Sequence, residues 1–218
     1  MKTIFALWGV GDLRAADLAA RLPEVAAAQA NIADAAVETA MLRITTFDAP
    51  VRAVVSVWWA GDPRPEAAER ALSAVAERVA GWHVEEVTPI PPPVTAALER
   101  APGLSNIAFL RKPDGLPQAD WLDRWRNRHT AIAIETQATF GYVQNVVTGP
   151  ATAGAPGIAG IVEELFPIEA LGDPHAFYGS GGDAAELARR IDRLMASVAT
   201  FGGDRNLDVV PTSRYRLR

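Results

Sequence analysis

The two halves of this chain of 218 residues carry hydrophobic patterns in the same order. Each half begins with a short apolar run, TIFALWG at 3–9 in the first and IAFLR at 107–111 in the second. An amphipathic helical pattern, two β-type runs, a second amphipathic helix and a short closing strand then follow in each half. This order, β-α-β-β-α-β, is that of the ferredoxin-like unit. We therefore expect two ferredoxin-like repeats in tandem.

The boundaries of the predicted elements follow from the spacing of apolar residues. The later predicted strands are 37–47, 51–59 and 84–88 in the first half and 140–147, 158–166 and 207–210 in the second. The stripes of the predicted helices are Leu18, Leu22, Val25 and Gln29; Leu72, Val75 and Val79; Trp121, Trp125, His129 and Ile132; and Leu187, Ile191, Leu194 and Val198. Between the halves, the segment Pro89-Ile-Pro-Pro-Pro93 is too rich in proline for a helix or a central strand. It predicts a connector, and we expect units at 1–93 and 94–218.

A four-stranded antiparallel sheet with both helices on one face leaves its other face bare. Packing two such bare faces together buries apolar surface, at about 25 cal/mol per Å². The predicted fold class is therefore α+β, with two ferredoxin-like repeats packed sheet to sheet as a pseudo-dimeric α/β barrel and the helices outside.

Composition narrows the possible partners and compartments. The chain has no cysteine, which excludes disulfides, thiolate metal sites and cysteine nucleophiles. A net charge of −5 argues against nucleic acid as a partner, and no apolar run reaches the roughly 18–20 residues that span a membrane. The N-terminal apolar run is too short for a signal peptide, so we expect a cytoplasmic protein. Dinucleotide, P-loop and HExxH patterns do not occur, and we expect neither a metal nor a cofactor.

The second half carries a series of short motifs. They are FLRKP at 109–113, W-x3-W-x3-H at 121–129, YVQN at 142–145, GIVEELF at 160–166, DPHAFY at 173–178 and TSRY at 212–215. In this order and spacing they resemble the EthD family of the dimeric α/β-barrel superfamily, over about residues 104–218. Two positions depart from the family pattern: Ala159 stands where an aspartate is expected, and Leu165 where an aromatic residue is expected.

The resemblance implies a cofactor-independent ferredoxin-like unit with a ligand pocket between helices and sheet. Relatives include accessory proteins of bacterial ether degradation and fungal polyketide tailoring enzymes described as dehydratases or decarboxylases. Related barrels include cofactor-free oxygenases that act on polycyclic phenols. The family is functionally diverse, so the resemblance narrows the fold further than the reaction. We expect the pocket in the second half, with the first half as its structural partner.

His129 is the leading candidate for chemistry, because it follows Trp121 and Trp125 on one helical stripe. An imidazole there can act as a general acid and base, while the alternative is a core histidine bonded to the backbone. The two tryptophans either wall a flat substrate or pack in the core. Glu163 lies between apolar neighbours in a predicted strand, so it pairs with His129 or lies at an edge in water. Candidate substrate contacts besides the tryptophans are Tyr142, Asn145 and Phe166.

These observations predict a cofactor-independent enzyme, a lyase, dehydratase or isomerase acting on a hydrophobic aromatic or polyketide-like substrate by histidine acid–base chemistry. Three alternatives stay open: a non-catalytic ligand-binding or accessory protein, a cofactor-free oxygenase, and a haem protein with His129 as axial ligand. The expected partner is a small hydrophobic or aromatic ligand, with no nucleic acid and no membrane. The expected oligomeric state is a monomer or a homodimer.

Overall fold

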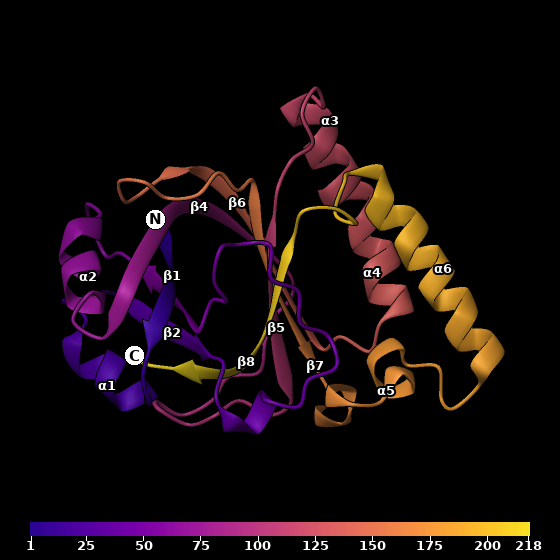
Figure 1. The fold of residues 1–218 in the computed structure, drawn as a ribbon, viewed down its shortest axis with the longest axis horizontal. Helices are drawn as coiled ribbons and strands as arrows, with labels where there is room; N and C mark the ends of the chain where they lie inside the picture. Colours follow the sequence, from indigo (N-terminus) through magenta and orange to yellow (C-terminus); the bar gives the residue numbers. More distant parts are fainter.

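The computed structural model describes residues 1–218 and shows a closed barrel of eight antiparallel strands with helices outside it (Figure 1). The strand order around the barrel is β1-β3-β2-β8-β5-β7-β6-β4. The strands are β1 (Lys2–Val10), β2 (Ala27–Ile32), β3 (Ala53–Trp58), β4 (Ala76–Ile90), β5 (Leu104–Leu110), β6 (Gly141–Pro150), β7 (Gly160–Phe166) and β8 (Asp208–Arg216). The α+β class and the barrel with outer helices, both expected from the sequence, are confirmed.

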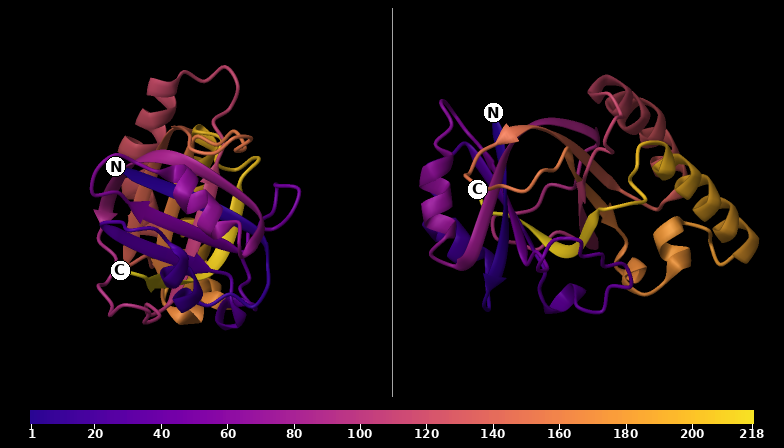
Figure 2. Two further views of the ribbon diagram at one scale, coloured as in Figure 1. Left: turned by 90° about the vertical axis from the view of Figure 1, so that its left-hand side faces the viewer. Right: turned by 45° about the horizontal axis from the view of Figure 1, so that its top comes forward.

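The helices lie on two opposite sides of the barrel (Figures 1 and 2). The bounds are α1 (Ala15–Arg21), α2 (Pro65–Leu72), α3 (Gln118–Leu122), α4 (Thr130–Thr136), α5 (Pro174–Tyr178) and α6 (Ala184–Thr200). A π-helical segment, Asp123–His129, joins α3 to α4, and short 3-10 turns span Ala35–Val37 and Ile168–Leu171. Helices α1 and α2 cover the strands of the first half, while the longer α6 packs against α4 over the second half. No helix is long and apolar enough to cross a membrane.

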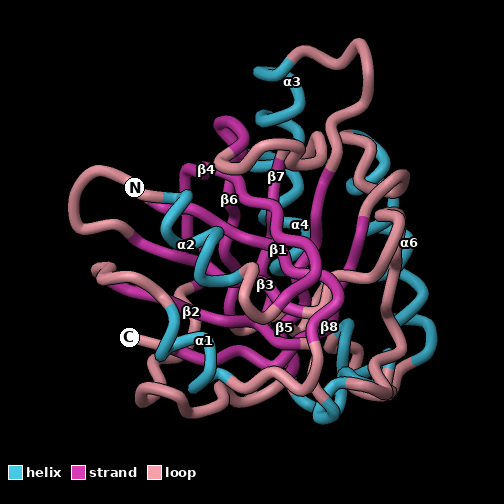
Figure 3. The backbone as a smooth tube through the Cα atoms, turned by 60° about the vertical axis from the view of Figure 1, so that its left-hand side comes forward, coloured by secondary structure: helices cyan, strands magenta, loops and turns pink.

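Each half of the chain supplies four adjacent strands of the barrel. The first half forms the run β4-β1-β3-β2 and the second forms β8-β5-β7-β6. Backbone pairing of β2 with β8 and of β4 with β6 closes the two seams between the runs. In the tube drawing, the strands accordingly form a central bundle with the helices around it (Figure 3).

The structure contradicts the predicted strand at 37–47. This segment belongs to a loop, 33–52, whose only pairing with the barrel is an isolated bridge between Ile44 and Val209. Its place in the sheet is taken by β2, which begins inside the stretch predicted as the first helix. The predicted helix stripe was too long: α1 ends at Arg21, before Leu22 and Val25, and Gln29 is an inward-facing residue of β2, as is Asn31. A strand that directs polar residues inward shows no apolar alternation, so its sequence resembles an alanine-rich helix.

The second predicted helix of the first half is also too long. Helix α2 ends at Leu72, and Val79 belongs to β4, which extends well beyond the predicted 84–88. Pro89 and Ile90, predicted as the start of the connector, end this strand. Pro89 lies at the end of β4, past most of its pairing with β6, where a missing backbone donor costs little, and the other prolines of the segment follow the strand. In the second half, the helices and strands β5, β6 and β7 lie where the sequence predicts them, whereas β8 extends beyond the predicted 207–210 to Arg216.

The interior of the barrel is divided into an apolar and a polar part. The apolar part contains side chains of both halves, among them Trp8, Trp82 and Phe109. The polar part centres on Glu163, which the structure places inside the barrel. Because a buried carboxylate needs hydrogen-bond donors, its four partners come from three other strands. Gln29 (2.9 and 3.0 Å), Asn31 (2.8 Å) and Ser105 (3.1 Å) donate hydrogen bonds to it, and the Arg214 guanidinium forms an ion pair with it at 3.2 Å.

Candidate functional site

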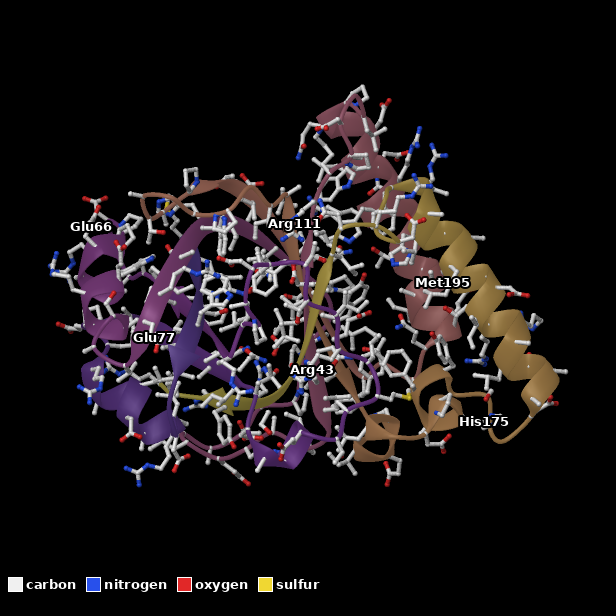
Figure 4. All side chains as sticks on the ribbon, viewed as in Figure 1. Arg43, Glu66, Glu77, Arg111, His175 and Met195 are labelled. Carbon is white, nitrogen blue, oxygen red and sulfur yellow. The ribbon has the colours of Figure 1, made fainter.

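A cavity of about 250 Å³ lies between the outer face of the second-half sheet and the helices. Of its 21 lining residues, 15 are hydrophobic, so it suits an apolar ligand of modest size. Strands β5 to β8 supply its floor, and the π-helical segment Asp123–His129, α5 and α6 supply its walls. Figure 4 labels Met195 of α6, which lines the cavity, and Arg43 on the loop 33–52. Leu42 and Ile44 of that loop also line the cavity, so the first half contributes to the site.

The tryptophans of the predicted stripe lie over the sheet. The rings of Trp121 and Trp125 are 4.7 Å apart between centroids, and both are buried. They sit on Gly160 of β7, where an added Cβ would lie 2.6 Å from the Trp125 ring and 3.2 Å from Trp121. A glycine at this position therefore lets the helix approach the sheet. Trp125 lines the cavity, whereas Trp121 packs beside it and donates its indole N–H to the Phe201 carbonyl at 3.1 Å.

His129 lines the same cavity from the end of the π-helical segment. Its Nδ1 lies 3.0 Å from the Ser197 hydroxyl oxygen of α6, and its ring packs on Phe201 at 4.9 Å between centroids. Burial lowers the pKa of His129 from 6.5 to about 4. The imidazole is therefore neutral at pH 7. It is suited to give or accept a hydrogen bond, and is a weak base.

Glu164 is the acidic residue that faces the cavity from the middle of the sheet, and sequence reasoning missed it. No hydrogen bond or ion pair stabilises its carboxylate, and burial alone raises its pKa from 4.5 to about 7. Two tyrosines of the cavity, Tyr142 and Tyr178, have raised pKa values. Burial is the larger cause, and the negative charge of Glu164 adds to it. A carboxyl group that titrates near neutral pH can accept a proton and return it.

Glu164 is the centre of a polar row across three strands. The backbone register places Asn106 of β5 opposite Glu164 of β7, and Tyr142 of β6 opposite Glu164 on its other side. Side chains directly opposite each other on one face have Cβ atoms about 4.5–5.5 Å apart. All three residues line the cavity, so a ligand on this floor meets an amide, a carboxyl and a phenol side by side.

The structure brings together some of the predicted site residues and separates others. His129, Trp125 and Tyr142 line one cavity. The expected pairing of Glu163 with His129 is wrong, because β7 alternates and Glu163 points into the barrel, on the opposite face from Glu164. Nor is Glu163 an edge residue in water, since it is 5% exposed.

Asn145 and Phe166 also lie away from the cavity. Asn145 is inside the barrel, where its Oδ1 accepts a hydrogen bond from Lys2 at 2.8 Å and its Nδ2 donates to the Ile161 carbonyl. Phe166 is fully buried and stacks on Phe177 at 4.2 Å between ring centroids, and only Phe177 reaches the cavity. One signal identifies the correct face of β7: Gly160, which the tryptophans require, shares its face with Val162 and Glu164.

No group of three or more histidine and acidic side chains is arranged to hold a metal ion. The remaining histidines lie outside the cavity. His175 has its Nδ1 2.6 Å from the Ser180 hydroxyl oxygen, and His83 has its Nδ1 3.4 Å from the Thr3 hydroxyl oxygen on the other side of the barrel.

Comparison with known proteins shows a likeness in fold. No protein-family model and no curated protein matches the chain, so membership of the EthD family is not confirmed. Among solved structures, an anthrone oxidase-like protein matches with a TM-score of 0.51 and 11% identity, over 99% of this chain and 92% of that one. A protein from Lactobacillus acidophilus NCFM, provisionally called a monooxygenase, matches with a TM-score of 0.49 and 10% identity, over 98% and 92%. The likeness to the anthrone oxidase-like protein is one of overall fold, and it extends over both halves of the chain.

Proposed function

We propose that this protein is a cofactor-independent enzyme that removes a proton from a small, planar aromatic substrate, with Glu164 as the group that takes the proton. One observation carries the proposal: a carboxyl group without a hydrogen-bond partner faces an apolar cavity beside Trp125. A carboxyl group without a hydrogen-bond partner in an apolar cavity lowers the stability of the fold. Side chains of this kind, with a perturbed pKa, are concentrated at functional sites. The acid–base role expected for His129 passes to Glu164, because an imidazole with a pKa of about 4 is the weaker base.

The other residues of the cavity receive supporting roles in this proposal. Trp125 and the apolar walls hold the ring system and exclude water. His129 binds a polar group of the substrate through its hydrogen-bonding nitrogen, with Ser197 fixing the orientation of its ring. Tyr142 stays protonated because its pKa is raised, so it offers a neutral hydroxyl beside Glu164 on the cavity floor. Glu163 and Asn145 join the strands inside the barrel and take no part in the reaction.

We propose oxidation by O2 as the reaction that follows proton removal. A methylene between aromatic rings and in conjugation with a carbonyl is acidic, and its carbanion is electron-rich enough to give one electron to O2. The resulting radicals join to form a C–O bond, and protonation gives a hydroperoxide. Loss of the second C–H proton then breaks the O–O bond and releases hydroxide, so that CH2 and O2 become C=O and H2O. The anthrone oxidase-like neighbour supports this choice over elimination of water.

The proposal is tested with anthrone as the substrate and an oxygen electrode as the detector. We expect the wild-type protein to consume O2 and anthrone in equal amounts, and Glu164→Gln to be about 10²–10⁴-fold slower. Glu169→Gln, on the exposed turn after β7, is the control and should keep the full rate. Equal rates in wild type and Glu164→Gln would refute the role of Glu164. Turnover that continues without O2 would favour a lyase or isomerase, and binding without turnover would favour a carrier.

We also propose that the two halves, 1–93 and 94–218, are diverged copies of one ferredoxin-like unit. The support is the matching strand order of β4-β1-β3-β2 and β8-β5-β7-β6. Under this proposal the second copy keeps the site. The first copy has turned its corresponding loop, 33–52, into part of the wall of that site.

A further inference from the structure

The side-chain amide of Asn106 is a polar group that the fold itself does not use. Asn106 is 3% exposed, yet its Oδ1 is buried without a hydrogen-bond partner. The flanking positions on the same strand face are Leu104 and Ala108, and the opposite residue on β8 is Pro211. None of these three has a polar side-chain group to offer. The one polar neighbour across the strands is Glu164.

An unpaired buried amide is costly, and an apolar residue of similar shape would avoid that cost. Asn106 lines the cavity, where a ligand can supply the missing partner. Oδ1 can only accept a hydrogen bond, so its partner is a ligand hydroxyl. When the amide turns over, its N–H faces the cavity and pairs with a ligand carbonyl, so the matching ligand group is an oxygen in either case.

We propose that Asn106 binds an oxygen atom of the substrate and so orients the substrate with its acidic hydrogen toward Glu164. The inference rests on the function proposed above and adds a substrate class: planar aromatic ketones and phenols, as opposed to plain hydrocarbons. Removing a proton from such a molecule places negative charge on the same oxygen. The Asn106 N–H then donates to the oxygen as its charge develops, as amide side chains do in oxyanion sites.

Two planar tricyclic probes of nearly equal size test the proposal by equilibrium dialysis: 9-fluorenone, which has a carbonyl oxygen, and fluorene, which has a methylene in its place. We expect wild-type protein to bind 9-fluorenone roughly tenfold more tightly than fluorene, since one buried hydrogen bond separates the two. Asn106→Leu should lose this preference and still bind fluorene. Asn127→Leu, an exposed asparagine on the helical segment, should keep the preference.

Stability gives a second readout that separates binding from a structural role. Because its amide has no partner within the fold, we expect Asn106→Leu to unfold at the same urea concentration as wild type or at a higher one. A lower midpoint would mean that the amide is already paired within the protein, for example with protonated Glu164, and would overturn the proposal. So would a wild-type protein that binds both probes equally, or an Asn106→Leu variant that keeps the preference.

These results are independent of those that test the enzyme itself. Neither affinity measurement requires turnover, so the preference for 9-fluorenone can be present while Glu164→Gln remains fully active, which would refute the proposed function alone. Conversely, loss of activity in Glu164→Gln without any preference for 9-fluorenone would refute the role of Asn106 alone.

Discussion

Replacing Glu164 by glutamine should make the stability of the protein less dependent on pH. The folded protein holds the Glu164 carboxyl in an apolar cavity, which raises its pKa from 4.5 to about 7. The unfolded chain releases this proton near pH 4.5, whereas the folded chain retains it until about pH 7. As the pH rises between these values, the unfolded state gains stability relative to the folded state. The glutamine variant has no proton to lose at this position.

The magnitude follows from the two pKa values. A difference from 4.5 to about 7, at about 1.4 kcal/mol for each pH unit, corresponds to about 3 kcal/mol. The free energy of unfolding of Glu164→Gln should therefore gain about 3 kcal/mol on that of wild type between about pH 4 and pH 8. The gain should be nearly complete by about pH 8. His129 also titrates in the acid part of this range, but it is present in both proteins and cancels in the difference.

The assay is urea unfolding followed by tryptophan fluorescence and circular dichroism at each pH, with Glu169→Gln as the exposed control. A constant offset between Glu164→Gln and wild type would reflect the new amide and would not bear on ionisation. Only the change of the difference with pH is diagnostic. If that difference is flat, the Glu164 carboxyl ionises like a carboxyl in water, and its proposed role as a base with a raised pKa is refuted.

Two further substitutions test the packing of the site and of the barrel. Gly160→Ala should lower the free energy of unfolding by about 1–3 kcal/mol in urea, because the added Cβ would lie 2.6 Å from the Trp125 ring. The control, Gly157→Ala, adds its Cβ in open space and should leave stability unchanged. Equal urea midpoints for the two variants would show that the helix can move away from the sheet. Glu163→Ala should lower the free energy of unfolding by about 3–5 kcal/mol, since it leaves the Arg214 guanidinium and three donors inside the barrel without their acceptor. A loss under about 1 kcal/mol would mean that water replaces the carboxylate.

The order of elements could be predicted from the sequence, whereas strand β2 could not. Periodicity reports which face of an element is apolar, and it succeeds for α6 and for strands with an apolar face. Strand β2 (AAQANI) has alanines on its outer face, while Gln29 and Asn31 on its inner face bind Glu163. Apart from the hydrogen bond that Gln29 donates to Asn31, these polar residues find their partners on strands from the other half of the chain. No local pattern contains that information.

The same limitation explains the choice of Glu163 over its neighbour. Alternation along β7 separates the two glutamates onto opposite faces but does not say which face meets the helices. Both faces of this strand are covered, one by the barrel interior and one by the helices, so both are largely apolar. Helix spacing, with the EthD resemblance, placed Trp125 and His129 on one stripe of their helix. On β6 the same kind of spacing separated Tyr142 from Asn145 without saying which of the two faces the helices.

The closed strand order also restricts how this protein can associate with a second copy. Every strand from β1 to β8 has a neighbour on each side, so the sheet has no free edge with unpaired backbone groups. Such edges are where sheets of separate chains join and where aggregation begins. If two copies associate, they do so through helix surfaces, loops or the exposed face of the sheet, and not by pairing strand edges. Because each seam is formed within the chain, the pairing of the two halves does not depend on protein concentration.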